Sequence, residues 1–292
     1  MPTSPGTGIA LERAMDFIDV GPNRIAYRRS GSGPALLLLH GWPFSHISYD
    51  ALTARLETHF TCYRPDTPGL GETGWSESTD FSFDGQAQTL RDFAGALGLS
   101  SYAVVAHDTG ATIARLLADS DARITKLVLL NTEIPGHRPP WIPLYRQLAR
   151  LPGTGRVFPL LLRWRSYLRS PLGFGGCFSD AQRIDAAFEA RVVDPLLASR
   201  QRVDGMLRYL RGIDWRVVDG LAAIHARLSM PVQLIWGADD PTFPIALARR
   251  MTAQFANAQL AEIPAARLLV HEELPEAVAD VALRFLGAVS NA

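Results

Sequence analysis

Lysine, cysteine and long apolar runs are scarce in this chain of 292 residues. Lys126 is its only lysine, so 28 of the 29 basic residues are arginine. Cys62 and Cys177 are too few for a disulfide framework, and free thiols fit a reducing cytoplasm, where we expect the protein to reside. No apolar run reaches ~18 residues and no charged-then-apolar signal opens the chain, so we expect neither a membrane-spanning helix nor a secretory leader. Residues 1–11, rich in Pro, Gly and Thr, are expected to form a loose leader.

Net charge is also lacking, because 29 basic residues are balanced by 29 acidic ones. A neutral protein has no overall attraction to nucleic acid or to an anionic membrane, and we expect neither as a partner. Hydrophobic content of 47% with 20% charged residues is ordinary for a globular enzyme. The length suits one large α/β domain with an insertion, although it also allows two domains.

Short β-prone runs recur along the chain and alternate with helical patterns after the first two. The predicted strands are Ala14–Val20, Arg24–Arg28, Ala35–His40, Thr61–Arg64, Tyr102–Ala106, Leu127–Leu130, Val232–Trp236 and Gln259–Ile263. The predicted helices between the later strands are Ile47–Thr58, Phe83–Leu97, Thr109–Asp119, Ile245–Phe255 and Pro275–Val289. Gly21-Pro-Asn23 is a turn signal that makes the first two strands a hairpin. The later alternation predicts a mostly parallel, eight-stranded sheet with helices on both faces.

The alternation stops between residues 134 and 227, where no strand is predicted. Four helices are expected in this segment: Ile142–Leu151, Val157–Arg169, Ala181–Leu197 and Gln201–Ile213. An all-helical insertion in a parallel sheet is best interpreted as a cap over the carboxyl ends of the strands, where open sheets bind ligands. We therefore predict a core in two parts, residues 1–133 and 228–292, with a helical cap of residues 134–227 between them.

Asp108 stands at the apex of a strand–turn–helix pattern. An apolar run from Tyr102 leads to Ala106-His-Asp-Thr-Gly110, and a helical pattern follows. The small residues on either side of Asp108 let the strand and the helix approach closely, as a nucleophile elbow requires. A carboxylate is suited to displacing a leaving group from saturated carbon, because the resulting ester can later be cleaved at its carbonyl. An aspartate capping the following helix is the structural alternative.

Five motifs occur in an order and spacing that resembles the α/β-hydrolase superfamily, in particular its aspartate-nucleophile branch of epoxide hydrolases and dehalogenases. They are Leu39-His-Gly-Trp-Pro43, Arg64-Pro-Asp-Thr-Pro-Gly-Leu-Gly71, Ala106-His-Asp-Thr-Gly110, Trp236-Gly-Ala-Asp-Asp-Pro-Thr-Phe-Pro244 and Val270-His-Glu-Glu-Leu-Pro275. The resemblance implies the α/β-hydrolase fold and no cofactor or metal. It also implies an oxyanion hole from the backbone N–H groups of Trp42 and Thr109, worth ~3 kcal/mol per donor. A tight turn that only needs Gly and Pro is the alternative for the first motif.

The acid and histidine of the implied machinery are less regular. Asp240 matches the family position for an acid that orients the catalytic histidine, and Glu133 matches a second position used by some dehalogenases. The expected histidine position, seven residues before Pro275, is occupied by Leu268. His271 lies on the same helical face if this stretch is coiled, so it is either the displaced catalytic histidine or a packed residue at the start of the last helix.

Opening an epoxide also needs an acid, which the resemblance assigns to a cap tyrosine. Tyr145, Tyr167 and Tyr209 are candidates, with Tyr209 nearest the expected place, and each could equally be a core aromatic. Trp42, His107, Trp141, Tyr145 and Tyr167 are the predicted substrate-binding residues, although His107 can also point into the fold. We thus expect an epoxide hydrolase that acts with water on a hydrophobic or aromatic small molecule, with a homodimer as one option for its assembly. Dehalogenation, a non-hydrolytic cyclase or isomerase, and a binding module without activity are the alternatives.

Overall fold

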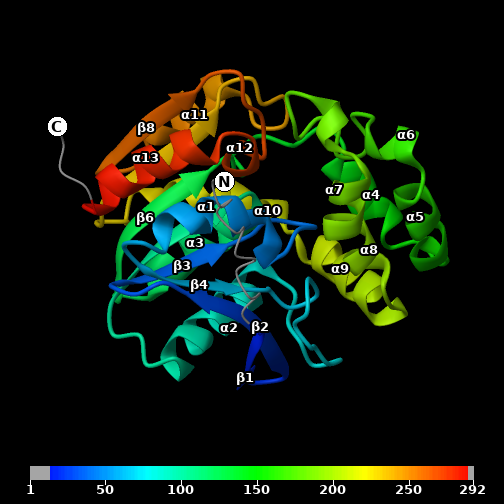
Figure 1. Cartoon of the computed structure of the whole chain (residues 1–292), viewed down its shortest axis with the longest axis horizontal. Helices are drawn as coiled ribbons and strands as arrows, with labels where there is room; N and C mark the ends of the chain where they lie inside the picture. The colour runs from blue at the N-terminus through cyan, green and yellow to red at the C-terminus, as the bar shows by residue number, and fades with distance from the viewer. Residues whose placement is uncertain (1–13, 289–292) are drawn as a thin grey trace, which may run out of the picture.

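A single eight-stranded sheet forms the centre of the computed structural model, which describes residues 14–288 (Figure 1). The expected leader, residues 1–11, lies outside the described residues. The strands are β1 (Asp16–Val20), β2 (Asn23–Ser30), β3 (Ala35–Leu39), β4 (Thr61–Pro65), β5 (Tyr102–His107), β6 (Ile124–Leu130), β7 (Val232–Gly237) and β8 (Ala258–Ile263). They are ordered β1-β2-β4-β3-β5-β6-β7-β8, and only the β1–β2 and β2–β4 pairs are antiparallel. The predicted mostly parallel sheet is confirmed.

The register of the central strands decides which residues meet at the carboxyl edge of the sheet. Leu39 of β3 lies beside Ala106 of β5, and His107 lies beside Leu130 of β6. Leu130 in turn lies beside Ile235 of β7. The loops that follow β3, β5, β6 and β7 therefore leave the sheet side by side. These loops carry Trp42, Asp108, Glu133 and Asp240.

Helices cover both faces of the sheet because its central strands are apolar on both sides. Leu36 and Leu38 pack in one buried layer with α1 (Asp50–Leu56) and α13 (Pro275–Leu286). Leu37 and Leu39 face the opposite layer, which also contains side chains of four other helices. These are α2 (Phe83–Ala96), α3 (Thr109–Ser120), α10 (Trp215–His225) and α11 (Ile245–Thr252). Alternate residues of one strand thus serve the two layers.

The segment between β6 and β7 is helical, as predicted, but more broken than predicted. It contains α4 (Ile142–Leu148), α5 (Thr154–Leu162), α6 (Arg165–Leu168), a 3₁₀ turn (Ala181–Arg183), α7 (Ala186–Phe188), a π turn (Glu189–Val193), α8 (Asp194–Leu197), α9 (Arg200–Gly212) and α10. The single helix expected at Val157–Arg169 is interrupted at Trp164, whose backbone is extended. The helix α10 was not predicted, although Asp214 caps it by accepting a hydrogen bond from the Arg216 N–H. We call residues 134–227 the helical insertion.

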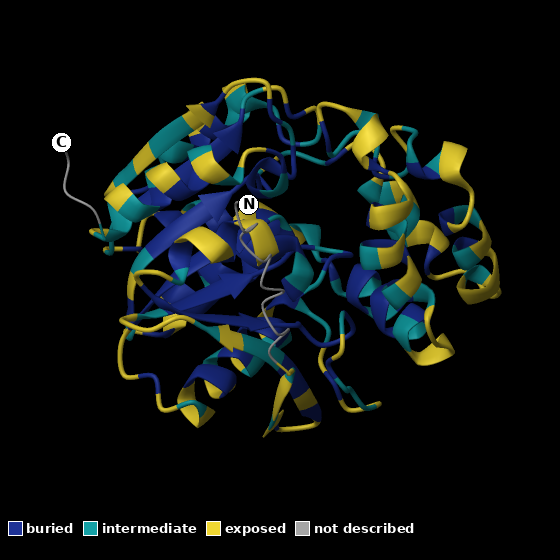
Figure 2. Ribbon diagram, viewed as in Figure 1, coloured by how far each residue is buried: buried dark blue, intermediate teal, exposed yellow. Residues whose placement is uncertain are grey.

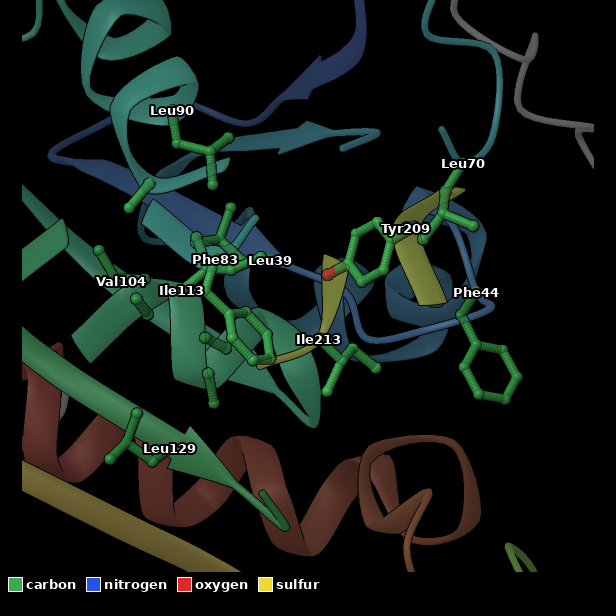
Figure 3. Close-up of a cluster of buried hydrophobic side chains, with 14 of the residues drawn as sticks. Leu39, Phe44, Leu70, Phe83, Leu90, Val104, Ile113, Leu129, Tyr209 and Ile213 are labelled. Atoms are coloured by element: carbon green, nitrogen blue, oxygen red, sulfur yellow. The ribbon is translucent and has the colours of Figure 1, made fainter. Parts of the chain in front are cut away.

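The hydrophobic core continues from the sheet into the helical insertion. Figure 3 shows Tyr209 and Ile213 of the insertion in one buried cluster with Leu39 of β3 and Phe83 of α2. Buried residues are concentrated in the strands, whereas the outer helices of the insertion are largely exposed (Figure 2). Among residues 14–288, no helix is both long and apolar enough to cross a bilayer.

Candidate active site

Asp108 occupies a strained turn between β5 and α3. Its backbone has φ 51° and ψ −133°, and in the described chain only Ala265 shares a positive φ among residues other than glycine. Such a conformation costs about 1–3 kcal/mol and persists where surrounding structure enforces it. The neighbouring backbone is packed closely around this turn, and two glycines make the close approach possible. A Cβ at Gly110 would overlap the His40 carbonyl, and a Cβ at Gly41 would overlap the Asp108 side chain. The strand–turn–helix prediction is therefore confirmed.

Two backbone N–H groups face the Asp108 carboxylate. The Trp42 N–H donates to Oδ2 at 3.0 Å, and the Thr109 N–H also stabilises the charged form. The side chain makes no capping hydrogen bond to α3, so the helix-cap alternative does not describe it. Burial and the neighbouring Glu133 raise the pKa of Asp108 above its ordinary value, and the two N–H groups oppose that rise. Trp42 and Thr109 thus occupy the positions that an oxyanion hole requires.

A cavity of about 310 Å³ opens above Asp108 between the sheet edge and the helical insertion. Its polar wall consists of Asp108, Thr109, Glu133, Tyr145, Cys177 and Thr242. The rest is mainly apolar or aromatic and includes Trp42, Phe44, Trp141, Phe174, Ile213, Phe243 and Leu268. Of the predicted substrate-binding residues, Trp42, Trp141 and Tyr145 line this cavity. Tyr167 and His107 do not.

Glu133 is held in the cavity wall by two threonines. Its Oε2 accepts hydrogen bonds from the Thr112 hydroxyl at 2.8 Å and from the Thr132 hydroxyl at 3.0 Å. Arg115, fully buried on α3, donates to the Glu133 carbonyl and to both threonine hydroxyls. Burial raises the pKa of Glu133, while Thr112 and the Arg115 charge oppose the rise. Glu133 and Asp108 are therefore two acids of one cavity, and each makes ionisation of the other less favourable.

Asp240 lies just behind the cavity wall. Its carboxylate accepts hydrogen bonds from the Asn131 side-chain amide at 2.7 Å and from the Thr242 N–H at 2.8 Å. Burial raises its pKa to about 7, against the opposing effect of these donors. Leu268 lines the cavity where the resemblance implied a histidine. The acid position is thus occupied without the imidazole that it would orient.

The structure does not bring His271 to the cavity. His271 is the second residue of α12 (Val270–Glu273) and is fully buried. Neither of its ring nitrogens has a hydrogen-bond partner. Its ring packs between Tyr49, at 4.8 Å between centroids, and His107, at 4.5 Å. Burial and the neighbouring His107 lower the pKa of His271. The expectation that His271 projects into the pocket is corrected by this packing.

His107 is likewise an interior residue and not part of the substrate pocket. Its Nε2–H donates to the Leu268 carbonyl at 2.9 Å, and burial lowers its pKa to about 3. None of the seven histidines, all of which fall within residues 14–288, lines the cavity. A general base for this cavity must therefore come from another residue type.

The cap tyrosines are engaged with the protein. The Tyr209 hydroxyl donates to Thr109 Oγ1 at 3.1 Å, and Tyr209 does not line the cavity. The Tyr167 hydroxyl donates to the Tyr145 hydroxyl at 3.1 Å, which itself donates to the Leu172 carbonyl. Burial raises the pKa of all three tyrosines. Only Tyr145 among them contacts the cavity.

The insertion also contacts the elbow through Trp42. Its indole N–H donates to the Met206 carbonyl of α9 at 3.1 Å, and its backbone N–H contacts Thr109 Oγ1 at 2.9 Å. The indole is therefore not free to hold a departing halide, because its one proton is already donated.

Several residues of the site were missed at the level of sequence. Thr112, Thr132 and Arg115 support Glu133, and Cys177 lines the cavity. Arg115 did carry a signal, since a charged residue inside the apolar helix at 109–118 requires a buried partner. Cys177 carried none, because a lone cysteine in a helical segment has no spacing that relates it to the motifs.

The chain belongs to the alpha/beta hydrolase family, whose model matches residues 36–281, and it is a hydrolase of that fold. Haloalkane dehalogenase 2 of Mycobacterium tuberculosis is 26% identical over 274 residues, covering 93% of this chain and 94% of the relative. The soluble epoxide hydrolase of Corynebacterium sp. strain C12 is 32% identical over 113 residues, 39% of each chain.

Solved structures show the same fold at low identity. The epoxide hydrolase CorEH superposes with a TM-score of 0.80 at 21% identity, over 95% of this chain and 99% of that one. The haloalkane dehalogenase DbeA from Bradyrhizobium elkani USDA94 superposes with a TM-score of 0.78 at 22% identity, over 94% and 98%. The predicted α/β-hydrolase fold is confirmed.

Proposed function

We propose that this protein is an epoxide hydrolase that opens a hydrophobic epoxide through an ester on Asp108. The observation that carries the proposal is a carboxylate, rather than a hydroxyl, on the elbow beneath a mostly apolar cavity. Asp108 attacks a ring carbon and forms an alkyl ester. The charge that develops during ester hydrolysis falls on the oxygen beside the Trp42 and Thr109 N–H groups.

Glu133 supplies the proton in this proposal. Like charges disfavour ionisation of both acids, so the resting pair holds one proton. The reactive form is the one in which Glu133 carries this proton and ionised Asp108 is the nucleophile. As Asp108 forms the C–O bond and the ring C–O bond breaks, Glu133 protonates the alkoxide. Esterification removes the charge of Asp108, and ionised Glu133 then takes a proton from water that attacks the ester carbonyl. As the intermediate collapses, Glu133 returns this proton to the leaving alkoxide, and the diol is released. The second proton of the water remains on the regenerated Asp108 carboxyl group, so the pair again holds one proton and the cycle is closed.

The same contacts favour an epoxide over a haloalkane. A departing halide needs side-chain N–H donors, and the Trp42 indole N–H is already donated to Met206. A departing alkoxide instead needs a proton, which Glu133 in the cavity wall can provide. Halide release from a simple haloalkane would contradict this preference.

Oxygen-18 water tests the covalent step. With styrene oxide as the probe, many turnovers in labelled water are expected to place label in the peptide that contains Asp108, because ester cleavage at the carbonyl exchanges a carboxylate oxygen. Diol formation without label in that peptide would refute the ester. Asp108→Asn, which retains the shape of the side chain, serves as the inactive control.

Glu133→Gln tests the proton donor. The variant keeps an acceptor for Thr112 and Thr132 but has no proton to transfer, so kcat is expected to fall by roughly 10²–10⁴. The acid and base limbs of the wild-type pH profile should both disappear with it. Glu133→Gln with a wild-type kcat and pH profile would show that another group moves the proton.

A further inference from the structure

The outer part of the helical insertion has an unusual composition. Residues 134–179 contain seven arginines and no aspartate or glutamate, although the whole chain is neutral. The same segment holds eight of the ten exposed large hydrophobic residues of the described chain. Positive charge and exposed apolar area are therefore gathered in one stretch, and the net charge of the whole protein conceals this.

These residues form stripes on two helices. On α4 and the turn after it, Leu144, Leu148 and Leu151 follow helical spacing, and each is more than 40% exposed. On α5 and the turn after it, Val157, Leu160 and Trp164 do the same, at 57%, 68% and 62% exposed. Figure 1 shows α5 and α6 at the outer edge of the insertion, on the side away from the sheet, with α4 next to them. We call the exposed residues of α4–α6 the arginine-rich face.

The arginines of this face are mostly free to meet a partner. Arg150, Arg156 and Arg163 are exposed and make no ion pair within residues 14–288. Arg165 is paired with Glu189, outside the acid-free segment. Each of these three arginines is next in sequence to an exposed apolar residue, so the face presents positive charge and apolar surface side by side.

The arginine-rich face adjoins the entrance of the active-site cavity. Trp141 precedes α4, is 40% exposed and lines the cavity. Leu172 follows α6, is 38% exposed and lines the cavity as well. A surface that covered this face would thus border the route to Asp108.

We propose that the arginine-rich face docks on the surface of an anionic lipid bilayer. Exposed leucine and tryptophan insert at the headgroup boundary, and arginine binds lipid phosphates, which is the composition of an interfacial helix. A second copy of the chain is a poorer occupant, because an isologous contact would bring the two sets of arginines together. Apolar substrates dissolve in the bilayer, so docking places the cavity entrance beside their reservoir.

Cosedimentation with vesicles tests the docking surface. The full chain is expected to bind vesicles of phosphatidylcholine with phosphatidylglycerol, to bind pure phosphatidylcholine weakly, and to dissociate as NaCl is raised. The double variant Arg156→Gln/Arg163→Gln should weaken binding roughly 30-fold, at about fivefold for each basic residue near the surface. Arg250→Gln/Arg284→Gln removes two exposed arginines from the core helices and should bind as the wild type does.

An apolar pair of variants separates insertion from simple charge attraction. Leu160→Ser/Trp164→Ser should reduce binding to anionic vesicles, whereas Phe17→Ser, at an exposed residue of β1, should not. Asp108→Asn should bind as the wild type does, so docking is measured independently of the proposed chemistry. All variants change exposed side chains or keep side-chain shape, and unaltered thermal melting verifies their folding.

Three outcomes would overturn the proposal. Equal binding to neutral and anionic vesicles, or no binding to either, excludes an anionic bilayer. Self-association that Leu160→Ser/Trp164→Ser abolishes, without vesicle binding, assigns the face to a second copy. Binding to poly-glutamate but not to vesicles assigns it to an acidic protein.

Discussion

Asp240 makes stability depend on pH in a direction opposite to that of most carboxylates. Burial raises its pKa from 3.8 to about 7, and at ~1.4 kcal/mol per pKa unit this corresponds to about 4 kcal/mol. The folded protein retains a proton that the unfolded chain releases above its ordinary pKa. The contribution is therefore complete below about pH 4 and is lost as pH rises through about 7.

Asp240→Asn is the perturbation that isolates this contribution. Asn131 is fixed, because its Oδ1 accepts from the Gly237 N–H and its Nδ2 donates to Asp240. An amide at residue 240 therefore opposes one donor with another, which lowers the free energy of unfolding by about 1–3 kcal/mol at every pH. In addition to this constant loss, the variant lacks the pH-dependent part of the free energy of unfolding that the Asp240 proton contributes.

The assay is urea unfolding of both proteins from about pH 5 to about pH 9. The buried histidines, whose lowered pKa values give the opposite pH dependence, contribute equally to both proteins and cancel in the difference. The gap between wild type and Asp240→Asn should be about 3 kcal/mol larger at the acid end than at the alkaline end. A gap that is constant with pH, or larger at alkaline pH, would refute the assignment of a neutral acid behind Leu268.

Three further substitutions test the site and its support. Gly41→Ala should lower kcat/KM at least ~10²-fold, because its Cβ displaces Asp108; steady-state kinetics with styrene oxide measure this, and wild-type activity would contradict it. Arg115→Met should lower the free energy of unfolding by about 1–3 kcal/mol in urea, because the Glu133 carbonyl and the Thr112 and Thr132 hydroxyls lose their buried donor, and an unchanged free energy of unfolding would contradict that role. His271→Phe should leave kcat/KM unchanged, since the ring only packs in the interior, and a large loss of activity would restore His271 as a catalytic residue.

The core and the elbow could be predicted from the sequence because their causes are local. The apolar run from Leu36 to Leu39 is typical of a strand buried on both faces, and the structure buries all four residues. Small residues around Asp108 are needed wherever a strand turns directly into a helix, and Gly110 indeed meets the His40 carbonyl. The register of β3, β5, β6 and β7 then brings the loops that contain the motifs together. The order and spacing of the motifs therefore indicated which residues meet at the site.

The sequence could not show whether His271 reaches the cavity, because the answer depends on the residue at which the last helical segment begins. Residues 268 and 271 share a face only if both are helical. The helix α12 begins at Val270, so Leu268 precedes it and faces the cavity while His271 packs against Tyr49. The helix boundaries within the insertion could not be predicted for a related reason. Trp164 interrupts the helix expected at Val157–Arg169, and no Gly or Pro beside it marks the end.

Two hydrogen bonds between α9 and the residues around Asp108 link the insertion to the elbow. Met206 receives the Trp42 indole N–H, and the Tyr209 hydroxyl donates to Thr109, so one helix of the insertion holds both residues whose backbone N–H groups face Asp108. A displacement of α9 would release both at once. The geometry of the loop that presents the carboxylate therefore depends on the placement of a helix that lies about 100 residues further along the chain and outside the sheet.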